Sequence, residues 1–153
     1  MSNVLKIAIS QLGVKEIVGP QHNMTIVNYA KEIGAKWVND DETPWCAIFM
    51  NWVLKRAGFK FTSSALARSF EKYSSPTLFP NPGDIVVFWR KSKESGLGHV
   101  GIFLGFDVDG DVFVLGGNQG NEVSIRTYPR HQVLSYRKIS DSVKSVNFES
   151  DVV

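Results

Sequence analysis

The sequence has little cysteine, because Cys46 is the only one among its 153 residues. A single thiol cannot close an internal disulfide, and it cannot supply the several thiolates of a structural zinc or iron–sulfur site. The length is that of one globular core. Cys46 is therefore either a small buried side chain or a reactive nucleophile, and its neighbours decide between the two.

Runs of one charge and long apolar stretches are also missing. Lys and Arg number 17 against 15 Asp and Glu, a net charge of +2, so we expect no nucleic-acid partner. No apolar stretch reaches the roughly 18 residues that span a bilayer, so we expect no membrane insertion. Residues 1–10 show no basic leader followed by an apolar segment. We therefore expect synthesis in the cytoplasm without a signal peptide.

Apolar side chains at spacings of three and four residues predict helices in the first third of the chain. The first covers residues 4–12, with Ser2 or Asn3 as its N-cap. The second covers residues 26–33, with Thr25 as its N-cap. A glycine follows each segment, as is typical of helix ends.

The next helix has the clearest boundaries in the sequence. Thr43 is its expected N-cap, Pro44 its first residue, and Gly58 follows its last turn. A weaker helical pattern covers residues 64–73. After Gly83 the period changes to that of strands.

We expect about five antiparallel strands in the second half of the chain. They cover residues 84–89, 99–106, 112–115, 123–128 and 133–139. Helices at the front and hairpins at the back predict an α+β fold, with the N-terminal helices packed on a C-terminal antiparallel sheet.

Cys46 falls in the first turn of the third predicted helix. Free backbone N–H groups and the helix dipole favour a thiolate there, which is the nucleophile of a cysteine hydrolase. Such an enzyme also needs a base. His99 follows a glycine-rich segment and begins an apolar strand, whereas His22 and His131 have the surroundings of surface loops. We therefore predict that His99 is the base.

A third polar group should orient the imidazole. If Phe106 faces Asp111 across the predicted hairpin, His99 lies opposite Asn118. If the loop is one residue longer, Gln119 is opposite instead. The sequence therefore predicts an amide partner and leaves both residues open.

Four segments together resemble a known family of enzymes. They are Glu42–Trp52 (ETPWCAIFMNW), Asn81–Phe88 (NPGDIVVF), Gly98–Phe103 (GHVGIF) and Gly116–Gln119 (GGNQ). This combination resembles the CHAP group, the cysteine, histidine-dependent amidohydrolases/peptidases, and the related NlpC-type cell-wall hydrolases, which have a papain-like fold. Because the resemblance covers about residues 4–140, we expect a CHAP-like catalytic domain over residues 1–140 and a peripheral extension over residues 141–153.

The resemblance implies roles for individual residues. Cys46 is the expected nucleophile, His99 the general base and then acid, and Asn118 the residue that orients His99. Many CHAP members have a Glu two residues before the matching Asn, where this chain has Gly116. That difference implies an amide-oriented Cys-His pair of the papain kind, with Gln119 as the alternate to Asn118.

The implied activity is hydrolysis of an amide bond in bacterial peptidoglycan, the expected substrate. The bond is either the N-acetylmuramoyl–L-alanine amide or one within a stem peptide or cross-bridge. Two settings fit: a phage endolysin released through a holin pore, or an antibacterial effector delivered by a secretion machine, with an immunity protein as its partner. We expect a monomer without a cofactor.

Other interpretations stay open beside this one. A non-catalytic wall-binding module and a papain-like protease acting on a protein would both keep the fold. Trp45, Trp89 and Glu16 are candidates for a substrate groove.

We expect no metal, because no ligand spacing joins His22 and His131 to Cys46 as a zinc site would require. Calcium in CHAP relatives leaves one acidic stretch as a candidate. It consists of Asp40, Asp41 and Glu42.

Overall fold

The computed structural model describes residues 2–17, 22–35 and 44–139. Its helices are α1 (Asn3–Ile9), α2 (Met24–Glu32) and α3 (Cys46–Ala57), with short 3₁₀ turns η1 (Ala67–Lys72), η2 (Lys93–Ser95) and η3 (Arg130–Gln132). Its strands are β1 (Pro76–Thr77), β2 (Ile85–Trp89), β3 (Gly98–Phe106), β4 (Val112–Gly116), β5 (Ser124–Tyr128) and β6 (Val133–Arg137). None of the described helices combines the length and the apolar character of a membrane span.

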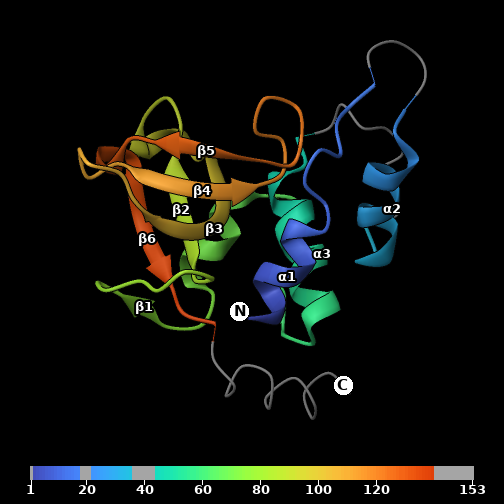
Figure 1. Cartoon of the computed structure of the whole chain (residues 1–153), viewed down its shortest axis with the longest axis horizontal. Coiled ribbons are helices and arrows are strands. Elements are labelled where there is room, and N and C mark those ends of the chain that lie inside the picture. The colour runs from blue at the N-terminus through green and yellow to red at the C-terminus, as the bar shows by residue number, and fades with distance from the viewer. Residues whose placement is uncertain (1, 18–21, 36–43, 140–153) are drawn as a thin grey trace.

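The strands form one antiparallel sheet in the order β1-β6-β2-β3-β4-β5. In Figure 1 this sheet lies on the left and α1, α2 and α3 lie on the right. α1 and α2 both pack on α3, which in turn contacts β3. The α+β prediction is confirmed. The sheet has one strand more than the five expected, because the two residues of β1 pair with the end of β6.

Alternation along the strands divides the apolar side chains between the two faces of the sheet. One face packs against the helices, and its core includes Phe49, Ile85 and Ile102. The other face carries a smaller core that includes Phe88 and Phe103. The central strands β2 and β3 are thus covered on both sides and form a rigid base for their own ends.

Helix α3 is the centre of the helical layer, since ten of its twelve residues are buried. It begins at Cys46, two residues later than predicted, and Pro44 precedes the helix instead of starting it. The N-cap is Trp45, whose carbonyl accepts the Phe49 N–H at 2.9 Å. The predicted cap Thr43 lies outside the described residues. Gly58 ends the helix in the left-handed region, at φ 86°, as expected.

The other helical predictions are partly corrected. Ser2 caps α1 as expected, with Oγ accepting the Leu5 N–H at 3.2 Å. α2 is capped by Asn23 and not by Thr25, because Asn23 Oδ1 accepts the Thr25 N–H at 2.8 Å.

The segment predicted as a weak helix at 64–73 contains the 3₁₀ turn η1. The predicted extension at 141–153 lies outside the described residues.

Candidate active site

The structure brings Cys46 and His99 into direct contact, although they lie in different layers. Cys46 is the first residue of α3, and His99 is the second residue of β3. Their side chains are hydrogen-bonded to each other, and both are buried. The thiol and the imidazole that the sequence singled out are therefore neighbours at the junction of helix and sheet.

Glycine allows β3 to bring His99 this close. A Cβ at Gly98 would lie 2.5 Å from the Phe88 carbonyl oxygen, far inside contact distance. The adjacent pairing of Phe88 with His99 then fixes where the imidazole leaves the sheet. Because both neighbouring strands are buried, the ring has a rigid support.

The surroundings of Cys46 favour the thiolate. Burial by itself raises the pKa of the thiol, but the hydrogen bond and the charge of His99 outweigh it. The backbone N–H groups of Val100 and Ala47 also donate to the sulfur. The pKa of Cys46 is therefore lowered from its ordinary value, as a nucleophilic thiol requires.

His99 shows the complementary shift. Burial by itself lowers the pKa of the imidazole, but the hydrogen bond and negative charge of Cys46 raise it, with help from a hydrogen bond to Gln119. The charge of Arg90 acts in the opposite sense. The net direction is upward, so the pair is stabilised as thiolate and imidazolium.

Gln119 fixes the orientation of the imidazole. His99 Nε2 lies 2.8 Å from Gln119 Oε1. The Gln119 amide nitrogen donates to the carbonyl oxygens of Val114, at 3.0 Å, and Ser124, at 2.7 Å. Because both amide hydrogens are used there, the oxygen must face the ring, and Nε2 must carry a proton. Nδ1 is then the nitrogen available to the thiol.

The expected contact between Asn118 and His99 is therefore corrected. The loop after Phe106 is longer than first assumed, since Phe106 pairs with Val112. A bulge between Phe103 and Gly105 then restores the earlier register, but β4 ends at Gly116. Asn118 turns away with a left-handed φ of 59° and lines the groove instead. The pairing of β3 with β4 therefore stops before Asn118. The next residue, Gln119, is the one that contacts the imidazole.

Two aromatic rings stack beside His99. The ring of Tyr128 lies 4.8 Å from the imidazole at an angle of 15°. The Phe88 ring lies 5.0 Å from that of Tyr128 and 6.2 Å from the imidazole, so the three rings form one cluster. Nothing in the sequence singles out Tyr128 as a site residue. The available signal was its place at the end of a predicted strand, which does not reveal which strand it faces.

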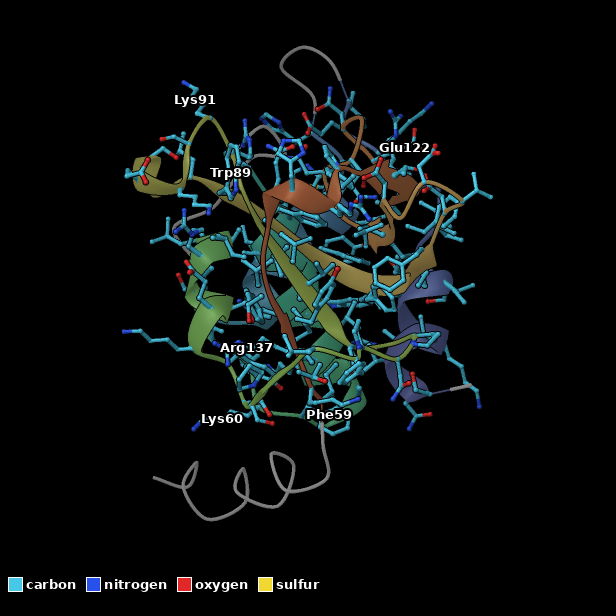
Figure 2. All side chains as sticks on the ribbon, turned by 90° about the vertical axis from the view of Figure 1, so that its left-hand side faces the viewer. Phe59, Lys60, Trp89, Lys91, Glu122 and Arg137 are labelled. Carbon is cyan, nitrogen blue, oxygen red and sulfur yellow. The ribbon has the colours of Figure 1, made fainter. Side chains whose placement is uncertain are left out.

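A groove of about 660 Å³ opens over Cys46 and His99. Trp89 lines it, as expected, together with Arg90, Tyr128, Asn118 and residues of the segment before His99. Figure 2 shows Trp89 at the same end of the molecule as Lys91 and Glu122, opposite the end with Phe59 and Lys60.

Trp45 and Glu16 do not line this groove, contrary to expectation. Trp45 is only 1% exposed, and its indole N–H donates to Glu16 Oε2 at 2.8 Å. A large side chain in the first position before a buried helix packs inward, and the carboxylate satisfies its buried N–H. Both residues therefore support the start of α3 and with it the position of Cys46.

Metal ligands do not gather in the part of the chain that the structure describes, where no three His, Cys, Asp or Glu side chains lie together. Neither His22 nor His131 lines the groove, and the His131 ring packs instead against Trp89. The acidic candidates for calcium, Asp40 to Glu42, lie outside the described residues.

Comparison with known families agrees with this site. The family model described as "CHAP domain" matches residues 38–118, a segment that contains Cys46 and His99 and ends one residue before Gln119. No curated protein matches the sequence. Since the match covers more than half of the 153 residues, the chain belongs to the CHAP-domain family, whose members are in general hydrolases of peptidoglycan.

Proposed function

We propose that this protein hydrolyses an amide bond of bacterial peptidoglycan, with Cys46 as nucleophile and His99 as acid and base. The observation that carries the proposal is the buried, hydrogen-bonded Cys46–His99 pair at the floor of an open groove. Gln119 takes the part of the positioning residue. Membership of the CHAP family supports peptidoglycan as the substrate.

The reaction uses the thiolate–imidazolium form of the pair, which both pKa shifts favour. The Cys46 thiolate attacks the amide carbonyl carbon, and a tetrahedral oxyanion forms. As the carbon–nitrogen bond breaks, the Nδ1 proton of His99 passes to the departing amine and a thioester remains. Neutral His99 then removes a proton from water, whose oxygen attacks the thioester. The carboxylic acid departs as the carbon–sulfur bond breaks, and the Cys46 thiolate and the His99 imidazolium are restored, so atoms and charges balance.

The start of α3 also offers a donor to the oxyanion. The Cys46 N–H belongs to the first turn, whose N–H groups have no partner within the helix itself. Asn39 and Thr43 are candidates for a second hydrogen-bond donor to the oxyanion. Both lie outside the described residues. The helix that lowers the thiol pKa thus also supports the charge that develops on the substrate.

The same chemistry serves both proposed settings. As an endolysin the protein reaches the wall through a holin pore, and as an effector it is delivered by a secretion machine and is matched by an immunity protein. In both settings it acts as a monomer on the wall. The scissile bond is either the muramoyl–L-alanine amide or a bond in the stem peptide or cross-bridge.

The decisive test is digestion of purified peptidoglycan by the wild-type protein and by Cys46→Ala and His99→Ala, with mass spectrometry of the released fragments. We expect release by the wild type alone, and the new chain ends identify the bond. Appreciable release by both variants would overturn the mechanism. Wild-type protein that sediments with the wall but releases nothing would favour the binding module.

A further inference from the structure

The groove over Cys46 has a one-sided charge. Among the described residues that line it, none is Asp or Glu, although the whole chain has 15 acidic residues against 17 basic ones. Arg90 is the only Lys or Arg side chain among those described lining residues. A cation in a concave site without carboxylates attracts an anionic group of a ligand.

Within the described part of the chain, the Arg90 guanidinium forms no ion pair and no hydrogen bond with another side chain. Arg56 and Arg68, in contrast, pair with Glu32 and Glu71. The backbone of Arg90 is fixed, because its N–H donates to the Leu97 carbonyl at 3.0 Å.

The carbonyl oxygen of Arg90 accepts two further hydrogen bonds. The donors are the Ser92 N–H, at 2.8 Å, and the Ser95 hydroxyl, at 2.6 Å. The main chain therefore anchors Arg90 at the rim of the groove and leaves its charged head for a ligand.

Arg90 lies close enough to the site for its charge to affect the side chains there. Its positive charge lowers the pKa of both His99 and Tyr128, although other causes outweigh it. Both of these side chains line the same groove. A ligand group bound by Arg90 would therefore lie near the scissile bond.

We propose that Arg90 is a specificity-determining residue that binds a free carboxylate of the peptide whose amide is cut. Guanidinium and carboxylate match as a planar, bidentate pair, which neutral amides cannot form. The groove then selects acidic stem peptides over amidated or uncharged ones. This inference rests on the proposed function, because it takes the groove to hold a peptide of the cell wall.

Binding to Cys46→Ala protein tests the assignment without turnover. The probes are a synthetic L-Ala–γ-D-Glu–L-Lys stem peptide with free carboxyl groups and the same peptide with those groups amidated. We expect the free acid to bind about tenfold more tightly at low salt, and less so at high salt, because Arg90 is exposed. In Cys46→Ala/Arg90→Gln the two peptides should bind alike.

Two variants complete the design. Lys6→Gln removes one positive charge in α1, away from the groove, and should keep the preference. Arg90→Lys keeps the charge but not the planar fork and should give an intermediate preference. Equal binding of both peptides to Cys46→Ala protein, binding of neither, or a preference that survives Arg90→Gln would overturn the assignment.

The outcome for the proposed function is read separately, from digestion of peptidoglycan by the protein with Cys46 intact. Release of fragments without any preference in binding keeps the hydrolase and removes the role of Arg90. A preference in binding without release keeps the role of Arg90 and removes the hydrolase.

Discussion

Gln119 joins His99 to Ser124 through one amide group, which accepts from the imidazole and donates to the Ser124 carbonyl. A carboxylate in this place could accept from the ring, but its second oxygen would face the carbonyls of Ser124 and Val114. The position therefore demands an amide. This gives a physical reason for the absence of an acidic third residue from the site.

Gln119→Glu is accordingly expected to be far from conservative. It would place an acceptor against two buried carbonyl oxygens and cost about 1–3 kcal/mol of unfolding free energy. Because the ring loses its fixed orientation, kcat should fall about tenfold or more. Urea unfolding and initial rates measure the two effects.

Asn118→Gly provides the matched control for this change. It alters the neighbouring residue and keeps the left-handed backbone, which glycine adopts easily. We expect a smaller loss of kcat than in Gln119→Glu. The reverse order would make Asn118 the residue that orients the imidazole.

The lowered pKa of Cys46 and the raised pKa of His99 predict a bell-shaped dependence of kcat/KM on pH. The acid limb should lie below the ordinary thiol value of 9.0, and the alkaline limb above the ordinary imidazole value of 6.5. Because the hydrogen bond that His99 donates to Gln119 Oε1 raises the pKa of His99, Gln119→Leu should move the alkaline limb to lower pH.

Alkylation of Cys46 by iodoacetamide reports the thiolate directly. The reaction should persist well below the ordinary thiol pKa in the wild type and require higher pH in His99→Gln. Alkylation of the wild type that follows an ordinary thiol titration would contradict the ion pair.

Tyr128 should stabilise the protonated form of His99 through the stacked ring. Its hydroxyl stays neutral, because burial raises the pKa of Tyr128 to about 12. Tyr128→Phe should therefore retain most of kcat, whereas Tyr128→Leu should lose roughly tenfold. The pH profile separates the causes, because only the loss of the ring should lower the alkaline limb. A loss in Tyr128→Phe equal to that in Tyr128→Leu would assign the role to the hydroxyl.

Gly117 lies where the sheet meets α3, and a side chain there has no room. Its Cβ would lie 2.6 Å from Phe49 Cβ and 2.8 Å from the Trp45 ring. We expect Gly117→Ala to lower the unfolding free energy by about 1–3 kcal/mol. Thermal and urea unfolding measure this, and an unchanged midpoint would show that the two layers shift apart without cost.

Local patterns in the sequence were enough to predict most of the fold. The apolar runs of β2 and β3 and the apolar residues of α3 are strong signals, because buried segments of this kind leave few alternatives. The exact helix starts were harder to predict. Asn23 and Thr25 both fit an N-cap, and the contact that chooses Asn23 includes a hydrogen bond from its amide to the Lys15 carbonyl at 2.9 Å.

The Cys46–His99 contact was predicted from the chemistry of each residue, but the partner of His99 depends on backbone detail that the sequence does not display. The longer loop after Phe106 and the bulge before Gly105 shift the register in opposite directions. Asn118 and Gln119 were equally compatible with the pattern, and only the early end of β4 separates them. The prediction that Trp45 lines the groove is wrong, because by sequence alone an aromatic residue beside a nucleophile fits a groove and a core equally well.

The contact between Gly117 and α3 also decides how this protein would lose activity. In the proposed reaction the nucleophile Cys46 is carried by a helix and the base His99 by the sheet, so the rate should depend on the spacing of the two packed layers. Heating or mild denaturant that loosens their contact should abolish hydrolysis while the circular dichroism of the helices and strands is still native. Activity is then a more sensitive gauge of packing than any spectroscopic signal of secondary structure.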